Sequence, residues 1–115
     1  MATVLLDHQL IAEIKRIQEV TGRDVLSECV RQLERNLAGF AAAFSDCVAR
    51  GDKSGAERAA HTLKGTCGQL GAEALGALFA DIERDAKAGD YAEARRRFDG
   101  AAQLVAQSLE ALKSA

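Results

Sequence analysis

Residues 24–51 read DVLSECVRQLERNLAGFAAAFSDCVARG, and the expected architecture follows from their spacing. Its apolar residues recur at alternating steps of four and three: Leu26, Val30, Leu33, Leu37, Phe40, Phe44 and Cys47. Such steps place side chains on one face of an α-helix and are typical of a helix that packs in a bundle. Asp24 is a favourable N-cap residue, and Gly51 ends the pattern. The segment therefore predicts a long amphipathic helix whose apolar face other helices must cover.

The rest of the chain repeats this helical spacing between aspartate and glycine residues that mark helix ends. A short first helix is predicted from about Asp7 to Val20. Its apolar side would carry Leu10, Ile14 and Ile17. Three later helices are expected at residues 52–70, 75–86 and 90–112.

The ends of these later helices carry their own signals. Asp52 or Ser54 can cap the third helix, Gly89 closes the fourth, and Asp90 with Glu93 forms a capping box for the last. Short connections between long helices imply antiparallel neighbours. We therefore expect an all-α fold, an antiparallel up-down four-helix bundle with a short additional N-terminal helix. It would form a single domain over residues 1–115.

The composition limits the classes of protein to which the chain can belong. With 115 residues and no proline, it fits one helical domain. Its net charge of −2 is spread over interspersed acidic and basic residues, which argues against a nucleic-acid interface. No apolar stretch approaches the ~20 residues of a membrane span, and no signal peptide is recognised. Three cysteines, an odd number without a C-x-x-C pair, favour a reducing compartment. We expect a cytoplasmic monomer without a membrane anchor.

Residues 59–71, AAHTLKGTCGQLG, have an unusual distribution around the helix. A helix turns by about 100° per residue, from ~3.6 residues per turn. The face that carries His61 also carries Lys64, Gly65, Gly68 and Ala72, with Glu57 and Arg58 one turn earlier. The opposite face carries Ala59, Leu63, Thr66 and Leu70. Because the apolar side packs against the bundle, His61 is predicted to point outward.

Two glycines on this outward face need an explanation. Gly65 and Gly68 lie mid-helix, where each costs roughly 0.8–1 kcal/mol relative to alanine. They remove bulk beside His61, which lets another protein approach the imidazole closely. Lys64 lies next to His61 on the helix surface and can bind anionic oxygens. A histidine in this setting can form a covalent phosphoryl intermediate.

The run HTLKG at 61–65, followed by Gly68, Leu70 and Gly71, resembles the signature of histidine-containing phosphotransfer (HPt) domains of two-component phosphorelays. The family pattern is His-x-Leu-Lys-Gly, then small residues, an apolar residue and glycine, and every position matches. The resemblance extends over nearly the whole chain, because the length and the expected helices match as well. It implies that His61 accepts a phosphoryl group from a receiver-domain aspartate of a hybrid sensor histidine kinase. His61 would then pass it to the receiver aspartate of a response regulator.

The resemblance also implies roles for other residues. Lys64 would stabilise the phosphoryl group. Members of the family often place a polar side chain from the following helix near the histidine, and Glu83 occupies the matching place to orient the ring. Receiver domains would contact the outward face, at Glu57, Arg58, Gly65, Gly68, Gln69 and Ala72. Such modules hold no ATP site, so we expect a carrier without kinase activity or a cofactor, with Mg²⁺ supplied by the receiver.

Other interpretations of His61 stay open at this point. It would be an ordinary surface histidine in a purely structural bundle, although such a bundle has no use for two outward glycines. A metal site is not expected, because the chain has two histidines and no Glu-x-x-His motif of the kind that di-metal bundles use. The alternative from another class is an adaptor, a pseudo-phosphotransfer protein. It would bind receiver domains and regulate a two-component system without carrying phosphate.

Overall fold

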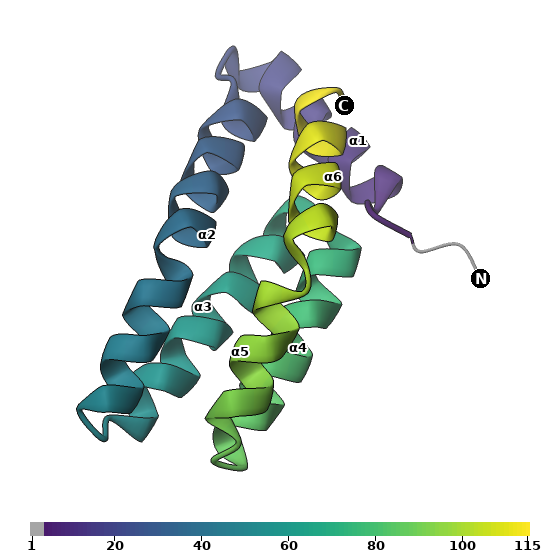
Figure 1. Cartoon of the computed structure of the whole chain (residues 1–115). Helices are drawn as coiled ribbons and strands as arrows, with labels where there is room; N and C mark the ends of the chain where they lie inside the picture. Colours follow the sequence, from purple (N-terminus) through teal and green to yellow (C-terminus); the bar gives the residue numbers. More distant parts are fainter. Residues whose placement is uncertain (1–3) are drawn as a thin grey trace.

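The structure, a computed structural model, describes residues 4–115, and the regular elements of this range are α-helices (Figure 1). They are α1 (His8–Thr21), α2 (Val25–Ala49), α3 (Lys53–Leu70), α4 (Glu73–Lys87), α5 (Tyr91–Asp99) and α6 (Ala102–Lys113). No strand occurs within residues 4–115, so the predicted all-α class is confirmed.

The helices pack as a bundle in which α3 lies between α2 and α4. Figure 1 shows α2, α3 and α4 running in alternating directions, joined by short turns. The chain then returns along α4 through α5 and α6, one after the other. The first helix, α1, crosses the end of the bundle where α2 begins. Because α3 has neighbours on two sides, only part of its circumference faces solvent.

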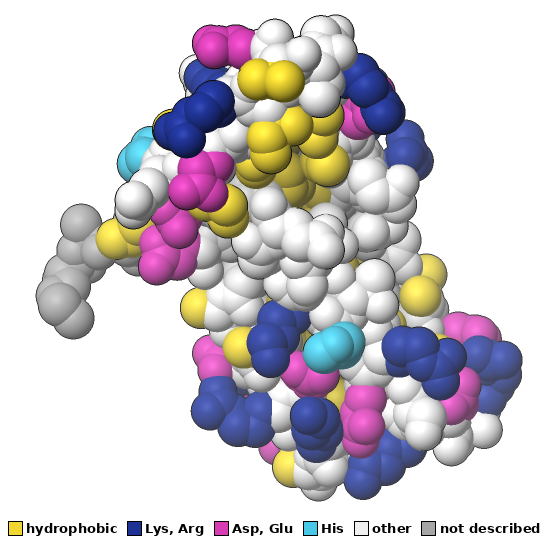
Figure 2. Space-filling model, turned by 180° about the vertical axis from the view of Figure 1, so that it is seen from behind, with side chains coloured by type: hydrophobic (Ala, Val, Ile, Leu, Met, Phe, Trp, Pro, Cys, Tyr) yellow, Lys and Arg dark blue, Asp and Glu magenta, His cyan; other side chains and the backbone are white. Residues whose placement is uncertain are grey.

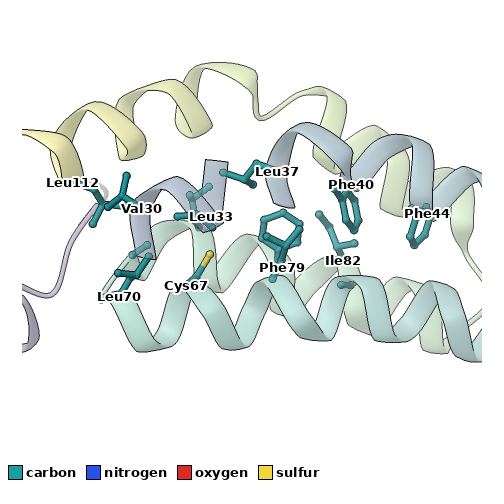
Figure 3. Packing of buried hydrophobic residues seen from close by; sticks show 14 of the residues in the cluster. Val30, Leu33, Leu37, Phe40, Phe44, Cys67, Leu70, Phe79, Ile82 and Leu112 are labelled. Atoms are coloured by element: carbon teal, nitrogen blue, oxygen red, sulfur yellow. The ribbon is translucent and has the colours of Figure 1, made fainter. Parts of the chain in front are cut away.

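The apolar face of α2 supplies much of the core, as its spacing predicts. Six of its seven predicted residues are buried: Leu26, Val30, Leu33, Leu37, Phe40 and Phe44. Figure 3 shows side chains of α2 facing those of the helices opposite. The ring centroid of Phe40 lies 5.4 Å from that of Phe44, 5.2 Å from Phe79 and 4.8 Å from Phe98. Such tilted and edge contacts add to the stabilisation from buried area. The seventh predicted residue, Cys47, is half-buried.

Aspartate side chains cap four of the helices. Each accepts a hydrogen bond from the backbone N–H three residues later, and the four are Asp7, Asp24, Asp52 and Asp90. For α3 the cap is thus Asp52 and not Ser54. At the other end of α3, Gly71 adopts a φ of 72°, a left-handed conformation that favours glycine and stops the helix. This tight turn sets where α4 begins and therefore which residues of α4 lie beside α3.

Two of the predictions about the helices were wrong. The last helix is not continuous, because α5 ends before Gly100 and α6 begins after Ala101. Glycine is a poor helix former, and Ala101 has φ −102° and ψ 15°, away from helical values. In α1 the buried residue is Ile11, whereas Ile17, assigned to the apolar side, is 54% exposed. Since α1 crosses the end of the bundle, its later turns lie at the surface.

Candidate functional site

The solvent-facing side of α3 carries the histidine that the sequence singled out. The His61 side chain is 68% exposed and that of Lys64 is 46% exposed. A Cβ atom added at Gly65 or Gly68 would meet no atom of a neighbouring element within 4 Å. The opposite side of the helix is buried at Ala56, Ala60, Leu63, Cys67 and Leu70. His61 therefore points away from the core, as the helical spacing predicts.

Glu83 of α4 lies beside His61 and joins it to two lysines. The Nδ1 atom of His61 is 2.8 Å from Oε2 of Glu83. The Nζ atom of Lys64 donates a hydrogen bond to the other carboxylate oxygen, Oε1, at 3.3 Å. Lys87, one turn later on α4, brings its Nζ to 3.8 Å from Oε2. One imidazole and two ammonium groups, from two helices, therefore converge on a single carboxylate.

Glu83 is the buried member of this group, with a side chain only 8% exposed. Burial alone would raise the pKa of the carboxyl group, because it disfavours the charged form. The hydrogen bonds with His61 and Lys64, together with the charge of Lys87, outweigh burial and hold the pKa of Glu83 below its ordinary value of 4.5. Glu83 is therefore an anion near neutral pH.

The ionised carboxylate fixes which nitrogen of His61 carries a proton. A carboxylate only accepts hydrogen bonds, so Nδ1 is the N–H donor across the 2.8 Å contact. In the neutral ring the free lone pair then belongs to Nε2. Because Nδ1 is held against α4, Nε2 lies at the opposite edge of a largely exposed ring. The geometry thus presents one nucleophilic nitrogen to a reactant from outside the chain.

The other residues assigned to this face lie at different depths. Arg58 and Gln69 are exposed, and Glu57 is half-buried. The assignment of Ala72 to the exposed face was wrong, because Ala72 is fully buried. The helical spacing does not extend to it: Gly71 ends α3 and turns the chain before Ala72.

Sequence reasoning missed Lys87 altogether. The sequence pattern that could have indicated Lys87 is its spacing from Glu83, because a glutamate and a lysine four residues later form a favourable ion pair on a helix. That pattern is common on solvated helices, so it does not by itself indicate a site. Only the packing of α4 against α3, which places Glu83 between the two lysines, brings Lys87 into the group.

The wider surface is mixed in charge. Figure 2 shows a histidine in the lower part of one face with basic and acidic side chains around it, and apolar side chains in the upper part. Between residues 4 and 115, no three or more His, Cys, Asp or Glu side chains form a group that could hold a metal ion. None of the described helices combines the length and the apolar character needed to cross a membrane.

The comparisons with known proteins bear on the same part of the chain. The family model described as Hpt domain matches residues 23–115. The match includes α2 to α6, and with them His61, Lys64, Glu83 and Lys87. No match was found among the curated proteins or among the solved structures.

Proposed function

Because the chain belongs to the Hpt domain family, whose function is histidine phosphotransfer in two-component phosphorelays, we propose that His61 carries the phosphoryl group. The observation behind this proposal is the 2.8 Å contact between Nδ1 of His61 and Oε2 of Glu83. It keeps the proton on Nδ1 and leaves Nε2 as the nucleophile. The other histidine, His8, lies at the start of α1, outside the matched residues.

The proposed step is phosphoryl transfer from an aspartyl phosphate of a receiver domain. The lone pair of Nε2 forms the new N–P bond while the P–O bond of the acyl phosphate breaks. The electron pair of that bond returns to the aspartate carboxylate. The imidazole of His61 keeps its Nδ1 proton and becomes cationic. The ionised carboxylate of Glu83 faces that N–H and stabilises the positive charge. Transfer to the next receiver follows the same path in reverse.

Lys64 is the residue that we propose for stabilisation of the phosphoryl group. It lies three residues after His61, so the two side chains are neighbours on the helix surface. An ammonium group forms strong, charge-assisted hydrogen bonds with phosphoryl oxygens. In the unphosphorylated chain this ammonium group donates to Glu83 at 3.3 Å. If it turns to the phosphoryl oxygens, it gives up this contact with Glu83.

Hpt domains interact with receiver domains, and we propose that the exposed side of α3 binds them. Gly65 and Gly68 leave open space beside His61, and Glu57, Arg58 and Gln69 flank it. The donor would be the receiver of a hybrid sensor histidine kinase, and the acceptor the receiver of a response regulator. The chain would act as a carrier without kinase activity or a cofactor. The receiver would supply Mg²⁺.

We propose that the whole chain forms one domain. The up-down four-helix bundle would consist of α2, α3, α4 and, as its fourth member, the consecutive pair α5 and α6. The additional helix would be α1. The alternating directions in Figure 1 support this scheme. Leu6 and Ile11 precede the matched residues yet belong to the same buried cluster, and the Asp7 N–H donates to the Gly71 carbonyl at 2.7 Å. Three free cysteines favour the cytoplasm, and the mixed surface charge favours a monomer.

The test is phosphoryl transfer from a panel of phosphorylated receiver domains to the native chain, to His61→Gln and to the matched control His8→Gln. We expect acid-labile, base-stable phosphate on the native chain and on His8→Gln, and none on His61→Gln. Receiver binding by the native chain without transfer from any receiver would favour the adaptor instead. Phosphate on His61→Gln would contradict the assignment of the carrier.

A further inference from the structure

Glu83 is paired with two lysines, and the two are held differently. Lys64 of α3 makes a hydrogen bond of 3.3 Å to Oε1. Lys87 of α4 lies 3.8 Å from Oε2, which is an ion pair beyond hydrogen-bond length. The side chain of Lys87 is 62% exposed, so its ammonium group has room to move closer. Since one hydrogen-bonded lysine already balances the charge of one carboxylate, the second lysine needs an explanation.

Phosphorylation of His61 would create competition for Lys64. A phosphoryl group on Nε2 brings more negative charge than the carboxylate, and it lies on the same helix face as Lys64. Glu83 now has two hydrogen-bond partners, His61 and Lys64. If Lys64 turned to the phosphoryl oxygens, only the Nδ1 proton of His61 would remain as a partner. Loss of an ammonium partner is unfavourable for a carboxylate that is only 8% exposed.

We propose that Lys87 replaces Lys64 as the ammonium partner of Glu83 when His61 is phosphorylated. This handover rests on the proposed function of His61 as the phosphoryl carrier. Lys87 closes from 3.8 Å to hydrogen-bond distance, Glu83 stays ionised, and Nδ1 keeps its partner. Lys64 is then free to bind the phosphoryl group. Lys87 is a positioning residue, because it acts through Glu83 and Lys64 without touching the phosphoryl group.

The test is the equilibrium constant for phosphoryl exchange between the full chain and the receiver domain that transfers fastest in the panel above. This constant compares phosphohistidine with histidine, and it does not depend on how tightly the two proteins dock. Lys87→Gln should shift the equilibrium about threefold away from phosphohistidine, the size expected for one solvent-accessible ion pair. Lys87→Arg should restore the native value. Arg84→Gln is the matched control, since it removes the same charge from α4 but pairs with Asp81.

The decisive comparison repeats Lys87→Gln in a Lys64→Gln background. Because Lys87 acts by releasing Lys64, Lys87→Gln should have no further effect on the equilibrium in a chain that already lacks Lys64. The effects of the two substitutions are then not additive. A second threefold loss in that background would mean that Lys87 acts on the phosphoryl group directly. An equilibrium for Lys87→Gln that equals that of Arg84→Gln would mean that Lys64 needs no replacement. Either result overturns the handover and leaves His61 as the carrier. Absence of phosphohistidine from the native chain would overturn the proposed function, and the handover with it.

Discussion

Under the proposed function, Glu83 is the residue that directs the reaction of His61. Its carboxylate holds the proton on Nδ1, and this leaves Nε2 as the nucleophile of an exposed ring. The same contacts lower the pKa of Glu83 in spite of its burial, because the imidazole N–H and the two lysines favour the charged form. A pKa that differs between the folded and the unfolded chain makes stability depend on pH.

The variant Glu83→Gln should therefore change the acid sensitivity of the fold. The pKa of Glu83 is lower in the folded chain, so its ionisation contributes stability that is fully present above the ordinary value of 4.5. That contribution is lost as the pH falls through the lower, folded value. Urea denaturation from neutral pH down to about pH 3 should show a steeper loss of unfolding free energy for the native chain than for the variant. Equal losses would show that the contacts of Glu83 do not favour its ionised form.

Within α3, the glycines have two different surroundings. At Gly55 a Cβ atom would collide with the capping carboxylate of Asp52 and would lie 2.8 Å from Sγ of Cys47, so this glycine makes room for the helix cap and for α2. At Gly65 and Gly68 the same atom would meet open space. Local packing thus explains the first glycine, and we propose that the other two allow the close approach of a partner.

Gly68→Leu separates the stability of α3 from its role in docking. A leucine there should raise the free energy of unfolding by about 0.5–1 kcal/mol, because glycine is unfavourable within a helix and the new side chain meets nothing. Receiver binding, measured by titration calorimetry, should weaken because the leucine stands beside His61. Gly55→Ala is the opposite control, with lower stability because the new methyl group collides with the capping carboxylate of Asp52 and with Cys47 of α2. Unchanged receiver binding by Gly68→Leu would remove the explanation offered for that glycine.

The helices themselves were largely predictable because their signals are local. Periodicity located the buried face of α2, and aspartate side chains marked the starts of α2 and α5. The break at Gly100 was missed, since a lone glycine in an apolar pattern does not say whether the helix continues. Ala72 was misplaced for a related reason: spacing was extended past the residue where the left-handed turn of Gly71 ends α3.

The site exists only where α3 packs against α4. Spacing along one helix predicted that His61 and Lys64 are neighbours. It could not predict that Glu83, 22 residues later, meets both of them, and that position came from the family resemblance. Lys87 went unnoticed because its role depends on the same packing. Local patterns specify which face of a helix is buried, whereas contacts between helices follow from how the buried faces fit together.

The most direct measurement identifies the ring nitrogen that carries the phosphoryl group. The chain is labelled with nitrogen-15 histidine, phosphorylated by an active receiver domain and studied by NMR. We predict a phosphoryl group on Nε2 of His61, with Nδ1 still protonated and His8 unchanged. A phosphoryl group on Nδ1 of His61, or on His8, would show that Glu83 does not hold Nδ1 and direct the reaction to Nε2.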